Sequence, residues 1–215
     1  MTNQAPPYEA PRSPLTALRG ERLAGIGHNQ GPPLDAAVSW RRHVWKKARK
    51  ALVPRLPLEV VKRRVRRATE LGLEYPQYAS ILLGTGRDIV GFLFTCDALG
   101  MELARGRVPE SVRAKLDALI RAERLLGVEA PSEPKRLAAA LDRNQGLVFA
   151  QAVALPGEQA PWAVGRDAIA GALAPLRLPS DAVVMVGTQP HHRTWADAAQ
   201  MAKFLPADQF FPGGR

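Results

Sequence analysis

The sequence predicts a mainly α protein with a multi-helix core, a basic helical hairpin and a small α/β lobe at its C-terminal end. Three observations carry this prediction. Apolar residues recur at helical spacing over the first two thirds of the chain, capping residues and glycines mark helix ends, and short strand-like apolar runs occur in the last third. The predicted parts are a disordered leader (1–34), a basic helical domain (35–128), a linker with a short helix (129–145) and an α/β lobe (146–215).

The composition is that of a folded chain with a strong positive charge. Of the 215 residues 46% are hydrophobic, and 30 Lys or Arg stand against 20 Asp or Glu, a formal net charge of +10. The single cysteine, Cys96, excludes an intramolecular disulfide and is typical of a reducing compartment. No apolar run approaches the roughly 18 residues that span a bilayer, and the polar start of the chain does not resemble a secretory signal. We therefore expect a cytoplasmic protein without an integral membrane segment.

The leader contains one unusual stretch. Residues 25–33 read GIGHNQGPP within a region rich in proline and glycine that has no steady apolar period. Glycine and proline at this frequency are typical of a linker. The alternative interpretation is a short motif that docks on a partner. The part IGHNQGP resembles a segment near the start of various uncharacterised bacterial proteins, some of them associated with phages or plasmids. The resemblance is limited to these seven residues and implies no chemistry.

Two amphipathic helices are expected to form the basic hairpin. The first runs from about Asp35 to Val53 and the second from Pro57 to Leu71, each followed by a proline or a glycine. At 100° per residue, apolar side chains fill one arc of each helix and Lys or Arg the other. Arg64 is the exception, because it falls on the apolar arc.

The positive charge is concentrated in this hairpin. From Arg41 to Arg67 there are twelve Lys or Arg and one acid, Glu59, whereas the rest of the chain has 18 basic and 19 acidic residues. Like charges three or four residues apart destabilise a helix by about 0.2–0.5 kcal/mol each, which favours an external polyanion over a merely solvated face. The candidate phosphate contacts are Arg41, Arg42, Lys46, Lys47, Arg49, Lys50, Lys62, Arg63, Arg66 and Arg67.

The segment after the hairpin approximates a helix-turn-helix. The spacing from Ala68 through Gly72 to Ile81 suits the corner, and a short helix over 76–83 would follow it. A proline inside that helix and its apolar residues favour the alternative, a connecting helix packed into the core. The helix-turn-helix reading adds Gln77 and Ser80 as contacts to base edges and Arg87 as a phosphate contact.

The remaining elements are expected to complete the core. Thr85 and Asp88 match a capping box that opens a helix to about Ala104, apolar nearly all round and therefore buried, with a strand over 89–95 as the competing reading. Further helices are predicted over Pro109–Leu126, Pro134–Arg143, 163–178 and 194–204, and strands over 147–155 and 182–186.

No constellation of residues indicates catalysis, a cofactor or a metal. Cys96 lies in an apolar segment, which predicts a buried, inert thiol. The histidines lack the spacing of a metal site, and the side chains of adjacent His191 and His192 are expected to diverge. The segment from Val183 to Thr188 has no glycine-rich phosphate-binding pattern. We therefore predict no catalytic residue, no cofactor and no metal site.

The predicted function is that of a nucleic-acid-binding accessory or regulatory protein that contacts the phosphate backbone. DNA is preferred to RNA on the helix-turn-helix spacing and the leader resemblance. One alternative is an interaction adaptor that docks its basic hairpin on an acidic protein or an anionic membrane surface. A third is a small enzyme with a site in the C-terminal α/β lobe that uses Thr188 and His191.

Overall fold

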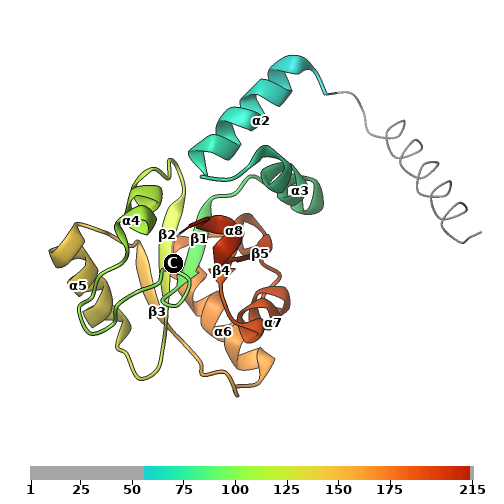
Figure 1. Cartoon of the computed structure of the whole chain (residues 1–215). Helices are drawn as coiled ribbons and strands as arrows, with labels where there is room; N and C mark the ends of the chain where they lie inside the picture. The colour runs from blue at the N-terminus through green and yellow to red at the C-terminus, as the bar shows by residue number, and fades with distance from the viewer. Residues whose placement is uncertain (1–55, 214–215) are drawn as a thin grey trace, which may run out of the picture. The chain divides into compact units, whose positions relative to one another are not determined.

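The computed structural model of the chain describes residues 56–213, which form an α/β fold around a parallel sheet of five strands (Figure 1). The strand order is β3-β2-β1-β4-β5, so the chain fills one side of β1 first and then crosses to the other. The strands are β1 (Gly91–Thr95), β2 (Glu123–Glu129), β3 (Gln151–Leu155), β4 (Val183–Gly187) and β5 (Lys203–Pro206). Because all five are parallel, their carboxyl ends meet at one edge of the sheet.

The helices cover both faces of the sheet. Helices α2 and α3 precede β1, α4 and α5 connect β1 to β2 and β2 to β3, and α6 and α7 connect β3 to β4 and β4 to β5 (Figure 1). Their bounds are α2 (Leu58–Glu70), α3 (Tyr75–Thr85), α4 (Glu110–Asp117), α5 (Pro134–Gln145), α6 (Trp162–Leu173), α7 (Pro190–Ala198) and α8 (Ala207–Phe210), with 3-10 turns at Ala174–Leu176 and Ser180–Ala182.

The prediction of a mainly α core is wrong. Strand β1 lies inside the helix predicted from Thr85 to Ala104, β2 begins inside the one predicted for Pro109–Leu126, and β5 inside the one predicted for 194–204. All five residues of β1 are buried, because a central parallel strand is covered on both faces. Such a strand has no polar–apolar alternation, so its sequence GFLFT is easily taken for part of a buried helix. The competing reading, a strand over 89–95, is the correct one.

The predicted capping box at Thr85 has a different role. Thr85 is the last residue of α3, where its hydroxyl donates to the Ile81 carbonyl (3.1 Å) and accepts from the Arg87 amide (3.1 Å). Asp88 accepts from the amide of Ile89 (2.9 Å). These bonds hold the turn between α3 and β1 instead of starting a helix.

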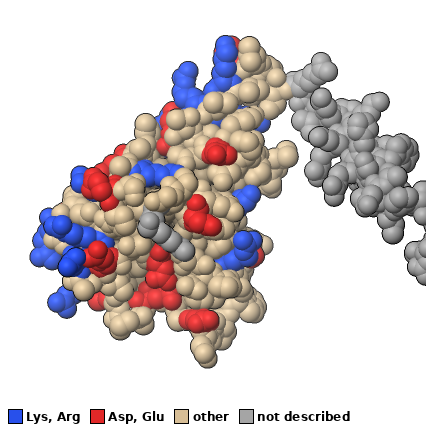
Figure 2. Space-filling view, in the orientation of Figure 1, with Lys and Arg blue, Asp and Glu red and all other residues tan. Residues whose placement is uncertain are grey.

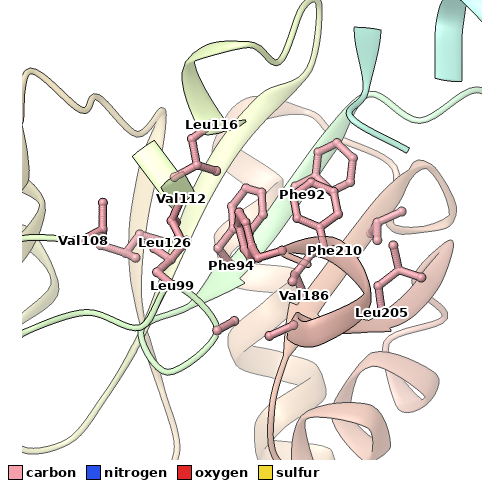
Figure 3. Close-up of a cluster of buried hydrophobic side chains, with 14 of the residues drawn as sticks. Phe92, Phe94, Leu99, Val108, Val112, Leu116, Leu126, Val186, Leu205 and Phe210 are labelled. Carbon is pink, nitrogen blue, oxygen red and sulfur yellow. The ribbon is translucent and has the colours of Figure 1, made fainter. Parts of the chain in front are cut away.

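Two buried clusters sandwich the sheet. On one face Phe92 and Phe94 of β1 stack with ring centroids 5.6 Å apart, and both contact Phe210 of α8 at 5.2 and 5.5 Å (Figure 3). The same cluster includes buried residues of α2, α3, α4 and α5. Leu93 points to the opposite face, where α6 and α7 contribute residues such as Trp195. Alternate residues of one strand thus supply two cores.

The predicted boundary between residues 145 and 146 falls within this sheet, because β3 pairs with β2 across it. Residues 57–213 belong to one compact unit. The leader (1–34), the helix predicted from Asp35 to Val53 and the basic residues between Arg41 and Lys50 lie outside the described residues. Within 56–213, every helix is too short or too polar to cross a bilayer.

Candidate functional site

An arginine-lined cavity lies where α2 and α3 meet the amino-terminal edge of the sheet. Its volume is about 580 Å³. The cavity lies beside the segments that lead into β1 and β2, since Arg67 in its wall donates to the carbonyls of Ile89 and Ile120. The lining residues are Arg63, Arg64, Arg66, Arg67, Glu70, Tyr78, Leu82, Asp88 and Arg121.

Arg67 is the structural anchor of this cavity. Its guanidinium pairs with Asp88 (Nε–Oδ2, 2.8 Å) and Glu70 (Nη1–Oε2, 3.2 Å), and donates to the carbonyls of Ile89 (2.8 Å), Ile120 (3.0 Å) and Arg121 (3.0 Å). Only 12% of the side chain is exposed. A guanidinium has five N–H donors, and these bonds occupy them. The prediction that Arg67 contacts phosphate is therefore replaced by a role in fastening α2 to the sheet.

Arg121 completes the same ionic network from a distant part of the chain. Its Nη2 lies 2.5 Å from Oε2 of Glu70, the oxygen that also pairs with Arg67. The hydrogen bond from Arg121 is the main cause that lowers the pKa of Glu70 below its ordinary value. Glu70 is therefore ionised at neutral pH, and it neutralises part of the charge of the two arginines.

Tyr78 and Asp88 are hydrogen-bonded to each other in the wall of the cavity. The Tyr78 hydroxyl donates to Oδ1 of Asp88 (3.0 Å), while Oδ2 of the same carboxylate accepts from Arg67. Burial and the bond to Asp88 raise the pKa of Tyr78 to about 12. The phenol is therefore neutral at physiological pH. Both carboxylates in the wall are engaged by arginines, so this arrangement suits the binding of a ligand better than acid–base catalysis.

Three arginines supply the surplus positive charge of the cavity. Arg63, Arg64 and Arg66 make no ion pair within residues 56–213, whereas Arg67 and Arg121 share the two carboxylates of the wall. Arg63 and Arg66 are exposed, and Arg64 is half-buried. Lys and Arg atoms protrude along the α2 end of the molecule in the charge-coloured view (Figure 2). The net effect is a cationic, solvent-accessible surface that would hold an anion.

The other predicted contacts are dispersed. Lys62 is exposed and pairs with Glu59 at 3.0 Å, and Arg87 pairs with Asp181 at 2.8 Å. Gln77 and Ser80 lie on α3, where Ser80 accepts from Nζ of Lys203 (3.0 Å). Helix α3 agrees with the predicted short helix and contacts α2. These residues do not border the cavity, and base contacts by Gln77 or Ser80 stay a prediction.

Two arginines of the cavity, Arg64 and Arg121, were not predicted from the sequence. Arg64 was assigned to the apolar arc of its helix, but that arc is itself partly exposed in α2: Leu58 is 66% and Val65 43% exposed. Arg121 is far from α2 in sequence and reaches Glu70 only because β1 and β2 are neighbours. No pattern of neighbouring residues in the sequence predicts such a contact.

Cys96 is buried directly after β1, as predicted, although it follows a strand instead of lying on a helix. Burial raises the pKa of its thiol to about 12, so the reactive thiolate is scarce at neutral pH.

Comparison with known proteins yields no relative. No protein-family model matches the chain, and neither the curated proteins nor the solved structures give a significant match.

Proposed function

We propose that this protein binds the phosphate backbone of a nucleic acid through α2 and the arginine-lined cavity. The observation that carries the proposal is the set Arg63, Arg64 and Arg66, which have no acidic partner within the described part of the chain and border one cavity. The role is that of an accessory or regulatory protein, with DNA preferred to RNA.

The residue type supports a phosphate ligand. A guanidinium is planar and always charged, and it can donate two parallel hydrogen bonds to one phosphate. Arg63 and Arg66 are three residues apart on α2, so they lie on the same side of the helix and repel each other. A bound phosphate would relieve that repulsion. Seven further Lys or Arg occur in the sequence between residues 41 and 55, outside the described residues, and they increase the positive charge of the segment before α2.

A salt titration tests the proposal. The full chain is titrated with duplex DNA, single-stranded RNA and vesicles that contain anionic lipid, each over a range of KCl concentrations. Each neutralised phosphate contributes a slope of about −0.9 for duplex DNA and −0.7 for single strands in a plot of log affinity against log salt. We expect a steep slope with nucleic acid. Binding to vesicles that equals or exceeds binding to nucleic acid would favour the membrane-surface alternative instead.

Charge reversal locates the contact. In the double variant Arg63→Glu/Arg66→Glu the affinity should fall and the slope for DNA should flatten by about two, because two phosphate contacts are lost. The matched control is Arg107→Glu/Arg143→Glu, which changes the net charge equally at two exposed arginines that do not line the cavity. Equal losses in both variants would show that only the net charge matters, and the assignment to α2 would be wrong.

A further inference from the structure

We propose that Glu129, His191 and His192 form a binding site for a divalent transition-metal ion of the zinc class at the carboxyl edge of the sheet. Glu129 is the last residue of β2, and the two histidines are the second and third residues of α7, which follows β4. Strand β1 lies between β2 and β4, so α7 brings the imidazoles to a carboxylate two strands away.

The three side chains converge on one point. Nε2 of His192 lies 2.5 Å and Nε2 of His191 3.5 Å from the same oxygen, Oε1 of Glu129. One ligand atom from each residue falls within 4.8 Å of the other two. The imidazole centroids are 4.4 Å apart, so the expectation that these adjacent side chains diverge is wrong. Ligand atoms about 2.0–2.2 Å from a tetrahedral zinc lie about 3.3–3.6 Å apart. The separation of His191 and Glu129 fits this distance, whereas His192 and Glu129 would have to move apart by about 1 Å to admit an ion.

Burial separates this cluster from ordinary surface histidines. The side chain of His192 is fully buried, and that of His191 is 13% exposed. Nε2 of His191 is inaccessible to solvent and makes no hydrogen bond within residues 56–213, although Oε1 of Glu129 lies 3.5 Å from it. A buried polar atom without a partner is unfavourable, and coordination to a cation would satisfy its lone pair. This unpaired nitrogen is an observation separate from the convergence of the ligand atoms, and it also indicates a ligand.

The fold makes room for the two rings. A Cβ at Gly187, the last residue of β4, would lie 2.8 Å from Nδ1 and 3.0 Å from Cβ of His192. Behind the histidines the indole of Trp195 lies 4.6 Å from the His191 ring and 5.6 Å from the His192 ring, centroid to centroid. The imidazoles are therefore held in place by close packing against Gly187 and Trp195.

The donor set selects the kind of ion. Two imidazole nitrogens and one carboxylate oxygen suit Zn²⁺, Co²⁺ or Ni²⁺ better than Mg²⁺ or Ca²⁺, which prefer oxygen ligands. Three protein ligands leave one position of a tetrahedral ion open to water or to a substrate. The site is independent of the arginine-lined cavity, which lies at the opposite, amino-terminal edge.

An ion bound to His192 would change the proton position on its ring and the hydrogen bond that the ring accepts from Gln189. Nδ1 of His192 accepts from the backbone N–H of Gln189 (3.2 Å), so the proton of the neutral ring is on Nε2, facing Glu129. An ion at Nε2 takes the place of that proton, which moves to Nδ1. The Gln189 amide then loses its acceptor. Metal binding should therefore alter one identifiable backbone amide near the site.

Metal titration of the full chain, stripped with a chelator, tests the proposal. We expect one equivalent of Zn²⁺ to bind, Co²⁺ to give the intense visible absorption of a four-coordinate ion, and Mg²⁺ to be ineffective. In amide NMR spectra, Zn²⁺ should shift the Gln189 resonance and accelerate its hydrogen exchange. Absence of Zn²⁺ binding, or binding that leaves the Gln189 amide unchanged, would overturn the proposal.

Variants distinguish this site from adventitious binding. His191→Gln and Glu129→Gln should each lower the affinity for Zn²⁺ by about 100-fold or more, because removal even of groups that only support a metal ligand costs 10–100-fold. The matched control is His28→Gln/His43→Gln, which removes the other two histidines of the chain. Thermal unfolding of each metal-free variant verifies that the fold is kept. Unchanged affinity in His191→Gln, or a loss confined to the control, would contradict the assignment.

Discussion

Arg66 and Arg67 are adjacent in the sequence but have opposite surroundings. Arg66 is exposed and makes no ion pair within residues 56–213, whereas Arg67 is nearly buried and satisfies two carboxylates and three carbonyls. Adjacent positions on a helix point about 100° apart, which is enough to place one side chain in solvent and the other against the sheet. The same charge is therefore available to the proposed phosphate ligand at one position and stabilises the fold at the next.

A pair of alanine substitutions should separate these roles. Arg67→Ala is expected to lower the free energy of unfolding by about 2–4 kcal/mol, because it removes the donor to Oδ2 of Asp88 and to the carbonyls of Ile89 and Ile120. Arg66→Ala should change it by less than about 0.5 kcal/mol. Urea unfolding of both variants measures the difference. Similar values for the two would show that Arg67 does not anchor α2.

Glu70 should make stability depend on acidic pH. Its pKa is lowered, chiefly by Arg121, so its carboxylate stabilises the fold above the ordinary value of 4.5 and the contribution is lost as the pH falls through the lower folded-state pKa. The wild type should therefore be more stable than Glu70→Gln at neutral pH, and the difference should shrink below about pH 4. Denaturant unfolding at several pH values checks this. A difference that grows on acidification would have the wrong sign for this ion pair.

At the scale of the element, the contact between α6 and α7 depends on a glycine. A Cβ at Gly165 would overlap the indole ring of Trp195, which is 1% exposed. Gly165→Ala should therefore destabilise the fold by about 1–3 kcal/mol through overpacking. Gly171 lies on the same helix with no heavy atom near the site of its absent Cβ, so Gly171→Ala should stabilise it by up to about 1 kcal/mol. Thermal unfolding compares the two, and equal effects would refute the packing argument.

Elements with clear end signals were predictable, and the strands β1 and β5, which lie within sequences of helical period, were not. Helices α2 and α5 begin next to prolines and end before glycines, and both agree with the predicted elements to within a few residues. Strand β4 was also predicted, because VVMVG is rich in β-branched residues. By contrast, GFLFT in β1 and KFLP in β5 follow helix-like sequences. They are too short to interrupt the helical period of apolar residues, so they were assigned to helices.

At the scale of the molecule, the candidate sites depend on which strands become neighbours. The helical period of α2 is sufficient to predict that Arg63 and Arg66 are exposed. It does not predict that Arg121 reaches Glu70, or that Glu129 meets His191, because those contacts join segments that are distant in sequence. Such contacts follow from the strand order, and two recognised strands out of five do not indicate that order.

The strand order also determines when the protein can fold during its synthesis. Strand β1 ends at Thr95, but β4, its second neighbour, begins only at Val183. A ribosome adds about 5–20 residues per second, so synthesis of the chain between Thr95 and Val183 takes roughly 4–18 s. During this time the edge of β1 that later pairs with β4 has no neighbouring strand. An unpaired apolar strand is a target for aggregation, so nascent chains of this protein should need protection by chaperones until β4 has emerged.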